Sequence, residues 1–435
     1  MMDALSIISK YMLADGFDLI VDLDKSHGSR MVDKQTGKSF LDFFSFFASS
    51  PIGLNHPDLL ENDFLKRLAR VAVNKPSCSD FYTEEMAEFV ETFGRVGIPG
   101  FLPNLFLISG GALAVENALK ASFDWRVRKN LKKGYTNEVG SKVIHFKQAF
   151  HGRSGYTLSL TNTFDPRKTK YYPKFDWPRV SNPKVTFPIE ENFEQIMIAE
   201  DKSIQEIHDA AEKYGDDIAC LIIEPVQAEG GDNHFRPQFF KRLRELADTH
   251  DFLLIYDEIQ TGVGMTGKFW AFNHFEGGQP DILCFGKKMQ VCGILASNRI
   301  KEVEKNVFEE SSRINSTWGG NLVDMFRATK YLEVIEKEKL VDNAAKMGEY
   351  MLHQTQELQE DFPEKIFNAR GLGLLIAFNL TSAEKRNIVK KQAYKNNLLL
   401  LGCGEKTIRF RPYLNVNESE IDEGMNILRD IIKEL

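Results

Sequence analysis

The sequence is poor in cysteine, and its few cysteines do not lie where disulfides or a metal site would need them. The five are odd in number, far apart and free of any CxxC spacing: Cys78, Cys220, Cys284, Cys292 and Cys403. We therefore expect neither a disulfide framework nor a zinc site, and no other metal site is predicted. A reducing cytoplasm is the predicted compartment.

Long apolar runs and basic clusters are also missing. No apolar run approaches the roughly 20 residues that a membrane-spanning helix needs, and the amino-terminal stretch MMDALSIISKYMLADG lacks a basic start. The net charge is -7, whereas nucleic-acid binding needs clustered lysine and arginine. A local basic stretch, WRVRKNLKK at residues 125–133, is interpreted as the solvated end of a helix. Neither a membrane nor a nucleic acid is a predicted partner.

The chain does have the length and composition of a globular enzyme. With 435 residues, 43% of them apolar and 27% charged, it is too long for one core, so two or three domains are expected. Thr36 and Gly37 separate two extended runs, which predicts a hairpin within an amino-terminal arm over residues 1–60. A large domain is expected over residues 61–325, and a smaller α+β domain over residues 326–435.

Six short apolar runs predict the strands of one sheet. Their hydrophobicity is continuous rather than alternating, which is typical of strands buried on both faces in a parallel sheet covered by helices. The runs are NLFLIS (104–109), SKVIHF (141–146), DIACLIIE (217–224), DFLLIYDE (251–258), DILCF (281–285) and VCGILAS (291–297). Residues 237–250 have helical spacing and predict one connecting helix. The predicted fold class is therefore α/β. A long helical stretch after residue 325, strand-like runs at 371–380 and 398–411, and a terminal helix predict the smaller domain.

Ligands of open α/β sheets bind at the carboxyl ends of the strands, so residues there are site candidates. After the first run, Gly110, Gly111 and Ala112 open a helix whose free N–H groups suit a phosphate, although a simple helix cap gives the same pattern. Asp257 and Glu258 end the fourth run, where a carboxylate needs a cation or a donor. A ligand contact, a helix cap and an ion pair all fit this pair.

Two adjacent lysines follow the fifth run. Only one of Lys287 and Lys288 can point at the strand end, and the other should reach solvent or a phosphate. A nucleophilic lysine needs a desolvated amine or neighbouring cations that keep it partly neutral. An ordinary basic turn has the same residues, so the pattern alone leaves both interpretations open.

Aromatic and charged residues after other runs complete the set of candidates. Phe150, His151 and Arg153 lie in a glycine-containing turn and suit stacking on a planar ligand and binding of a carboxylate. Glu229 and Arg409 are further candidates. Surface charge explains any one of them, but their joint occurrence after successive strands favours a site.

Together these motifs resemble the class III (ω-amino) aminotransferases, pyridoxal-phosphate enzymes of fold type I. The resemblance covers nearly the whole chain and rests on FHGR, IIEPVQ, DEIQTGVGMTG, a GK thirty residues after the aspartate, and STWGGN. It implies pyridoxal 5'-phosphate as the cofactor. It also implies a large domain with a mainly parallel seven-stranded sheet between helices, together with a smaller α+β domain.

The resemblance also implies a role for each matching residue around the cofactor. Lys287 would bind the cofactor covalently, Asp257 would hold its pyridine nitrogen, and Gln260 would contact its hydroxyl side and the substrate. An anionic aspartate keeps the ring nitrogen protonated, which makes physical sense for an electron sink. The other implied contacts are Phe150 on the ring face, Gly111 and Ala112 on the phosphate, and Thr317 reaching the phosphate from the neighbouring subunit of a homodimer with shared sites.

Within the class, SGGALAVENALKASFDW, AEGGDNHFRP and FGKKMQVCG resemble the members that act on L-lysine. These transfer its ε-amino group to 2-oxoglutarate, giving L-glutamate and 2-aminoadipate 6-semialdehyde, which cyclises to piperideine-6-carboxylate. Met289 stands where the resemblance predicts a threonine; this departure leaves the expected chemistry intact and bears only on fine substrate tuning. The alternatives are another ω-aminotransferase, acting on ornithine, GABA or a diamine, and a cofactor-binding protein without enzymatic activity.

The two substrates need two carboxylate positions. The resemblance implies that Arg153 and Arg409 bind substrate carboxylates, with Arg153 suited to the remote one and Arg409 to the α-carboxylate of glutamate. A bare Arg409 would be unfavourable beside the apolar chain of lysine. We therefore hypothesise that Glu229 pairs with Arg409 in the lysine half-reaction and swings away for 2-oxoglutarate.

Overall fold

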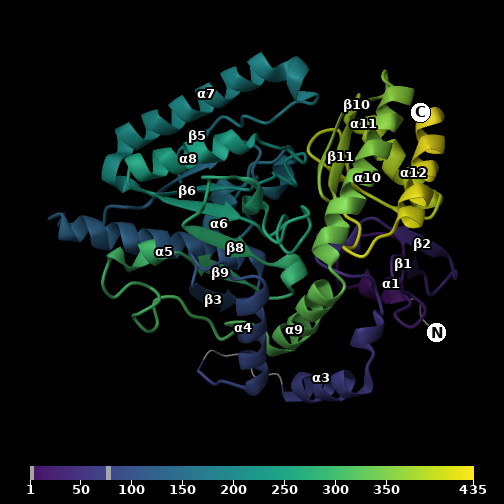
Figure 1. Cartoon of the computed structure of the whole chain (residues 1–435), viewed down its shortest axis with the longest axis horizontal. Helices are drawn as coiled ribbons and strands as arrows, with labels where there is room; N and C mark the ends of the chain where they lie inside the picture. Colours follow the sequence, from purple (N-terminus) through teal and green to yellow (C-terminus); the bar gives the residue numbers. More distant parts are fainter. Residues whose placement is uncertain (1–3, 75–79) are drawn as a thin grey trace.

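The computed structural model describes residues 4–74 and 80–435, so Cys78 lies outside the described residues. Figure 1 shows a large part built on a central sheet, and a smaller part in which the amino-terminal strands lie beside the carboxy-terminal helices and strands. Among the described residues, no helix combines the length and the apolar character that crossing a membrane requires.

The central sheet has seven strands in the order β3-β9-β8-β7-β6-β4-β5. Their bounds are β3 (Asn104–Ile108), β4 (Lys142–Phe146), β5 (Arg179–Val180), β6 (Ile218–Ile223), β7 (Leu253–Asp257), β8 (Ile282–Phe285) and β9 (Cys292–Ala296). Only β9 runs antiparallel to its neighbours, β3 and β8, and the other neighbouring pairs are parallel. The predicted α/β class with a mainly parallel sheet is confirmed, and each of the six apolar runs forms a strand.

Helices surround this sheet and the smaller part (Figure 1). Those of the described ranges are α1 (Ala4–Ile8), α2 (Ser45–Ala48), α3 (Asn62–Asn74), α4 (Glu84–Val96), α5 (Gly111–Lys132), α6 (Gly155–Leu160), α7 (Ile189–Tyr214), α8 (Pro237–Thr249), α9 (Leu322–Lys337), α10 (Leu340–Asp361), α11 (Ala383–Lys395) and α12 (Glu418–Lys433). The predicted helix at residues 237–250 is α8. Lys339, with a left-handed φ of 53°, separates α9 from α10 within the predicted long helical stretch.

The continuous hydrophobicity of the strands reflects burial on both faces. All six residues of β6 are buried. Cys220 and Ile222 pack in one core cluster with apolar residues of α5, whereas Leu221 and Ile223 pack in another with residues of α8. Because successive strand residues point to opposite faces, α5 and α8 cover the two sides of the sheet.

The basic stretch at residues 125–133 forms the end of a helix, α5, as predicted, but only residues 131–133 are exposed, whereas residues 125–130 are buried or half-buried. Arg126 is only 1% exposed, and its guanidinium binds the carboxylate of Asp216 at 2.5 Å and the carbonyl oxygen of Asp251 at 2.9 Å. Lys129 binds the carboxylates of Asp251 and Glu302. The stretch is basic because it pairs with acidic loops of the same chain.

Two smaller sheets build the rest of the molecule. The predicted hairpin consists of β1 (Arg30–Val32) and β2 (Ser39–Asp42), and β2 also pairs in parallel with β12 (Leu398–Leu399). The second sheet has the order β10-β11-β14-β13. Its strands are β10 (Ile366–Leu372), β11 (Leu375–Leu380), β13 (Leu401–Cys403) and β14 (Thr407–Phe410). The β2–β12 pairing joins the amino-terminal segment to the carboxy-terminal part.

Candidate active site

A cavity of about 650 Å³ lies at the carboxyl ends of the parallel strands. It brings together nine of the ten predicted cofactor and substrate residues. The lining residues are Phe47, Gly111, Ala112, Phe150, His151, Gly152, Arg153, Lys168, Glu224, Ala228, Glu229, Asp257, Ile259, Gln260, Lys287, Cys292 and Arg409. The tenth, Thr317, is exposed and does not line the cavity of its own chain.

Asp257 ends β7 and is 5% exposed. Its Oδ2 accepts a hydrogen bond of 2.8 Å from His151 Nδ1, and its Oδ1 accepts one of 3.2 Å from the backbone N–H of Ile259. Among the described residues His151 Nε2 is buried without a hydrogen-bond partner. The pair therefore presents a fixed carboxylate at the wall of the cavity, with histidine orienting it.

Glu258 follows Asp257 but faces away from the cavity. Its carboxylate accepts hydrogen bonds from the backbone N–H groups of Ala271 and Phe272 at 2.9 and 2.8 Å, and from the hydroxyl of Thr261. Burial raises the pKa of Glu258 to about 7. The sequence allowed a ligand contact, a helix cap or an ion pair for these two acids. Glu258 is the one that caps backbone N–H groups, those of Ala271 and Phe272.

The side chains of the two adjacent lysines lie in different places. Lys287 lies just after β8, lines the cavity, and donates a 3.0 Å hydrogen bond from Nζ to the carbonyl oxygen of Phe47. Burial, reinforced by Arg409 and Arg411, lowers the pKa of Lys287 to about 8. Its amine is thus partly neutral near neutral pH, as a nucleophilic lysine requires.

Lys288 lies behind the cavity wall, 2% exposed, and donates to the carbonyl oxygens of Gln260 at 2.9 Å and Ala48 at 3.2 Å. The expectation that it reaches solvent or a phosphate was wrong. Burial and the neighbouring Lys287 hold the pKa of Lys288 well below its ordinary value. Met289 is also buried, at 1% exposure, and lies outside the cavity lining.

The carbonyls that receive these amines belong to a left-handed turn that the sequence did not predict. Residues 45–48 all have φ between 40° and 60° although none is glycine. Gln290 holds Ser49, the residue that follows this turn, because its Nε2 donates to the carbonyl oxygen of Ser49 at 2.6 Å. The turn places Phe47 in the cavity wall. The sequence of this segment, FFSFFA at residues 43–48, shows only its apolar character and no turn signal.

The amino terminus of α5 forms the glycine-rich end of the cavity. Gly110 has a left-handed φ of 110°, and Gly111 and Ala112 line the cavity. A Cβ on Gly111 would lie 3.1 Å from the side chain of Ile259, so a larger residue would crowd this wall. Free N–H groups at a helix start attract an anion, so a phosphate fits here.

Glu229 and Arg409 meet at the opposite end. Arg409 lies in β14, is 1% exposed, and donates from Nη2 to Glu229 Oε2 at 2.7 Å. Glu229 Oε1 accepts a second hydrogen bond from Lys168 Nζ. Burial alone would raise the pKa of Glu229, but Arg409 and Lys168 hold it below its ordinary value. Nε and Nη1 of Arg409 are buried without a partner among the described residues.

The remaining predicted residues line the space between these two ends. Arg153 is exposed at the mouth and makes no ion pair within the described chain. Gln260 lies beside Phe47, with 3.5 Å from its Nε2 to the carbonyl oxygen. Phe150 presents its ring to the cavity, with Lys168 Nζ 5.6 Å from the ring centroid.

These groups fit the cofactor that the sequence implies. A phosphate matches the start of α5, a pyridinium nitrogen matches the buried carboxylate of Asp257, and an aldehyde matches the partly neutral amine of Lys287. The aromatic ring of Phe150 offers a stacking face. Sequence reasoning missed Phe47, Lys168, Glu224 and Cys292 as lining residues. Glu224 and Cys292 do lie in the quoted motifs IIEPVQ and FGKKMQVCG, but no role was assigned to either.

Comparison with known proteins gives consistent results. The profile of the family described as aminotransferase class-III matches residues 12–432. The chain is 48% identical to the L-lysine-epsilon aminotransferase of Mycobacterium tuberculosis, and 47% identical to that of Amycolatopsis lactamdurans. Both matches cover 98% of this chain and 94% of the relative. The structure of lysine aminotransferase from M. tuberculosis in the internal aldimine form superposes with a TM-score of 0.97, at 47% identity, covering 99% of this chain and 98% of that one.

Proposed function

The chain belongs to the class-III aminotransferases, and from that premise we propose that it transfers the ε-amino group of L-lysine to 2-oxoglutarate. The products are L-glutamate and 2-aminoadipate 6-semialdehyde, which cyclises to piperideine-6-carboxylate. One observation carries the choice of substrates: Arg409 is neutralised by Glu229, whereas Arg153 at the mouth is free of ion pairs among the described residues. The cavity thus offers one permanent carboxylate site and one that can be switched.

The family uses pyridoxal 5'-phosphate, which is the cofactor of this chain, and its fold is the type I fold of these enzymes. When bound, the cofactor supplies an electron sink for the substrate carbon that loses a proton. We assign its covalent attachment to Lys287 and its ring nitrogen to Asp257. Further contacts are assigned to Phe150 for the ring face, Gln260 for the hydroxyl side, and Gly111 and Ala112 for the phosphate.

Asp257, His151 and Lys287 would then have different roles around the cofactor. The carboxylate of Asp257 would accept a hydrogen bond from the proton-bearing ring nitrogen, and His151 holds this carboxylate in place through the 2.8 Å hydrogen bond. The Nζ of Lys287, which lines the cavity, would act as the general base and acid that takes the proton from the amine-bearing carbon of the substrate and later gives one back. The pKa of about 8 suits a group that both accepts and donates this proton.

The arginines would bind the substrates in opposite orientations. Arg153 would hold the carboxylate that lies remote from the reacting carbon, in lysine and in 2-oxoglutarate alike. Arg409 would bind only the carboxylate next to the reacting carbon of 2-oxoglutarate, after Glu229 has moved aside. Lys168, which also binds Glu229, is available to retain it when that pair opens.

We further propose a homodimer with shared active sites. Thr317 is exposed and outside the cavity of its own chain, as a residue that reaches a partner's phosphate site would be. Light scattering of the purified protein should give twice the mass of the chain. Thr317→Ala should weaken cofactor binding, whereas a monomeric protein whose Thr317→Ala variant binds the cofactor normally would contradict the proposal.

Two organisational points are proposals as well. The division into residues 1–60, 61–325 and 326–435 is supported by the separate central sheet, while the β2–β12 pairing groups the first segment with the third. The cytoplasm is proposed as the compartment because the four cysteines in the described ranges are free thiols.

The deciding experiment mixes the holoenzyme with L-lysine and 2-oxoglutarate and identifies both products by mass spectrometry. Glutamate together with the cyclised six-carbon imine supports the proposal. Single-turnover absorbance measurements then compare lysine with ornithine, 4-aminobutyrate and diamines as amine donors. A faster reaction with any of these donors than with lysine would refute the assignment of the substrate, while leaving the aminotransferase family unaffected.

A further inference from the structure

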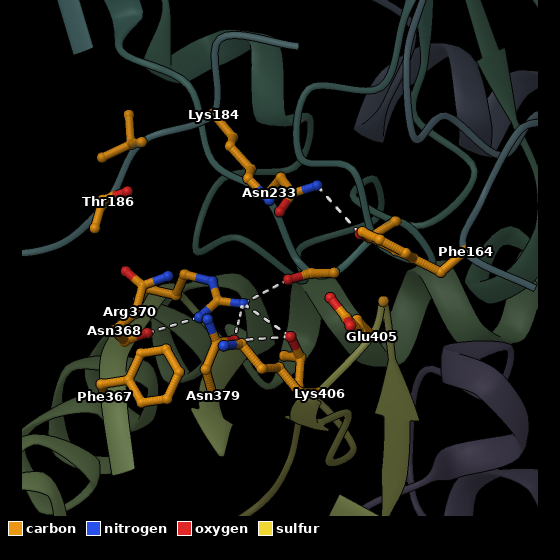
Figure 2. A pocket seen from close by; sticks show the side chains of 15 residues that line it. Phe164, Lys184, Thr186, Asn233, Phe367, Asn368, Arg370, Asn379, Glu405 and Lys406 are labelled. Carbon is orange, nitrogen blue, oxygen red and sulfur yellow. Dashed lines mark hydrogen bonds between the residues drawn. The ribbon is translucent and has the colours of Figure 1, made fainter. Parts of the chain in front are cut away.

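Figure 2 shows a second cavity, of about 220 Å³. Its lining includes Gly230 and Gly231, which directly follow Glu229 in the chain. One wall is the four-stranded sheet, which contributes Arg370 from β10 and Lys406 from the turn before β14. The opposite wall includes Lys184. Figure 2 shows Lys184 approaching from one side and Arg370 and Lys406 from the other, with open space between them.

The cations of this cavity outnumber the acids near them. Within the described chain, none of Lys184, Arg370 and Lys406 forms an ion pair, and Glu405 is the only acid in the lining. Outside the lining, the charge of Asp232 acts on Arg370. Lys406 instead lies over the ring of Phe367, 4.6 Å from its centroid. Burial and then Arg370 lower the pKa of Lys184, Glu405 opposes this shift, and Lys406 adds a smaller lowering effect.

Arg370 is positioned by the chain itself and cannot move to solvent. It is 2% exposed and donates to the carbonyl oxygens of Gly231, Asp232 and Asn368 at 2.5, 2.7 and 2.6 Å. Its positive charge therefore stays fixed at the wall. The two lysines, each on a flexible stem, are free to close on a ligand from both sides.

We propose that this cavity binds a compact dianion, either inorganic phosphate or a short dicarboxylate. The ammonium groups of Lys184 and Lys406 would supply charge-assisted hydrogen bonds, and the fixed Arg370 would add its field. Thr186 and Thr407 line the same cavity. The hydroxyl of Thr186 offers a further donor, whereas the hydroxyl of Thr407 already donates to Asn379 Oδ1 at 2.8 Å. Glu405 opposes the ligand, so its charge should weaken binding.

The loop of residues 228–233 connects this anion site with the active-site cavity. Ala228 and Glu229 line the active-site cavity, whereas Gly230 and Gly231 line the anion site. The backbone N–H of Gly404 donates to the carbonyl oxygen of Glu229 at 3.0 Å. A Cβ on Gly404 would lie 2.8 Å from the Cα of Gly231, so the two walls touch without side chains between them.

A bound anion would hold the anion-site lysines against this loop and so keep Glu229 on Arg409. This consequence rests on the proposed function, because the Glu229–Arg409 pair blocks the carboxylate of 2-oxoglutarate there. The anion should therefore slow the half-reaction with 2-oxoglutarate. The lysine half-reaction, which uses the closed pair, should be unaffected.

Binding is tested by isothermal titration calorimetry of the holoenzyme with inorganic phosphate. Lys184→Gln and Lys406→Gln should each raise the Kd about tenfold, equivalent to about 1.4 kcal/mol. Glu405→Gln should lower the Kd. The matched control is Lys34→Gln, which removes the same charge from an exposed turn between β1 and β2 and should leave the Kd unchanged. No binding by the wild type, or equal Kd values in all four variants, would overturn the site.

A second titration uses succinate in place of phosphate. The heat of binding that the wild type shows and the Lys184→Gln variant lacks is assigned to the proposed site. Tighter binding of succinate than of phosphate identifies a dicarboxylate as the ligand, and the reverse identifies phosphate. Single-turnover rates with 2-oxoglutarate are then measured with saturating anion and with chloride of equal ionic strength. A severalfold slower reaction in the wild type but not in Lys184→Gln supports the connection to Glu229. Equal rates with the anion and with chloride would overturn the connection to Glu229. The calorimetry would still decide whether the anion site exists, because it does not depend on the proposed function.

Discussion

Glu229 Oε2 accepts a 2.7 Å hydrogen bond from Arg409 Nη2, and this pair closes one end of the cavity. Arg409 is almost fully buried, so its charge cannot be balanced by solvent when the neutral chain of lysine lies beside it. Glu229 is 27% exposed at its side chain and has a second partner in Lys168. The more mobile member of the pair is therefore the acid, which is the arrangement that a switch requires.

Replacement of Glu229 should separate the two half-reactions. Glu229→Ala leaves Arg409 uncompensated beside lysine, so the lysine half-reaction should slow by about tenfold or more, equivalent to about 1.4 kcal/mol of lost stabilisation. The half-reaction with glutamate should change little, because Arg409 then binds its α-carboxylate. Stopped-flow absorbance of each half-reaction gives the ratio, with Glu276→Ala, an exposed acid, as control. An unchanged ratio would disprove the switch.

The two neighbouring lysines should behave differently towards the cofactor. Lys287→Ala removes the amine that lines the cavity and should abolish the visible absorbance of the covalently linked cofactor. Lys288→Met keeps the length of a buried side chain and should retain that absorbance, although losing the contacts to Gln260 and Ala48 should lower activity. Borohydride reduction followed by peptide mapping locates the linkage. A labelled peptide modified at Lys288 would reverse the assignment.

The depressed pKa of Lys287 gives a pH dependence for cofactor attachment. Only the neutral amine attacks an aldehyde, so the attachment rate of the apoprotein should rise with pH and level off above about pH 8 rather than above the ordinary value for lysine. Rapid mixing of apoprotein with pyridoxal 5'-phosphate over a pH series measures this midpoint. A rate that still rises steeply beyond pH 9 would mean that the amine is not desolvated in solution.

The same shift predicts how the stability of the apoprotein depends on pH. The folded-state pKa of Lys287 is about 8 and lies below the ordinary value of 10.5, so between these values the unfolded chain binds more protons than the folded one. The contribution of Lys287 to stability therefore rises with pH across this window. Urea unfolding of the wild type and of Lys287→Met at pH 7.5 and 10 should show a larger rise for the wild type.

The sequence predicted the central sheet well because its strands are buried on both faces, which leaves continuous apolar runs such as residues 218–223. It did not predict β5, whose two residues are too few to give any pattern. The burial of residues 125–130 was not predicted, because a run of cations does not reveal the acidic loops that cover it. Arg126 is paired with residues about 90 and 125 positions away.

The site was predicted in part for a similar reason. Strand ends marked Asp257 and the lysine pair, but the residues alone could not choose between Lys287 and Lys288, because both follow the same glycine. The choice depends on the left-handed turn at residues 45–48, whose carbonyls receive both amines. Four successive positive φ angles without glycine are enforced by such tertiary contacts, and local sequence preferences give no sign of them.

Substitutions of the neighbouring acids Asp257 and Glu258 should have different effects, the first on kcat and the second on the free energy of unfolding. Asp257→Asn keeps the shape of the side chain but cannot hold a proton on the ring nitrogen, so kcat should fall by at least about 100-fold, within the range of a lost electrostatic contact in an active site. Cofactor absorbance should persist, because Lys287 is unchanged. An Asp257→Asn variant with more than a tenth of the wild-type kcat would rule out this role for the carboxylate.

Glu258→Ala is the matched control for that experiment. It leaves the buried N–H groups of Ala271 and Phe272 without acceptors, which should lower the free energy of unfolding by about 2 kcal/mol. At temperatures where the variant stays folded, its kcat should lie within about threefold of the wild type, since Glu258 faces away from the cavity. Urea denaturation and initial-rate measurements on the two variants should therefore give opposite patterns.

The ion pair between Arg236 and Glu200 offers a test of stability far from the cavity. Glu200 is fully buried in α7, and both its oxygens accept hydrogen bonds from Arg236, at 2.8 and 2.7 Å. Arg236→Leu leaves a buried carboxylate without a counter-charge and should lower the free energy of unfolding by about 3 kcal/mol. The double variant Glu200→Met with Arg236→Leu should recover most of this loss, because an apolar pair needs no compensation. Equal stabilities of the single and double variants, measured by urea unfolding, would show that the carboxylate finds another partner or water when the arginine is removed.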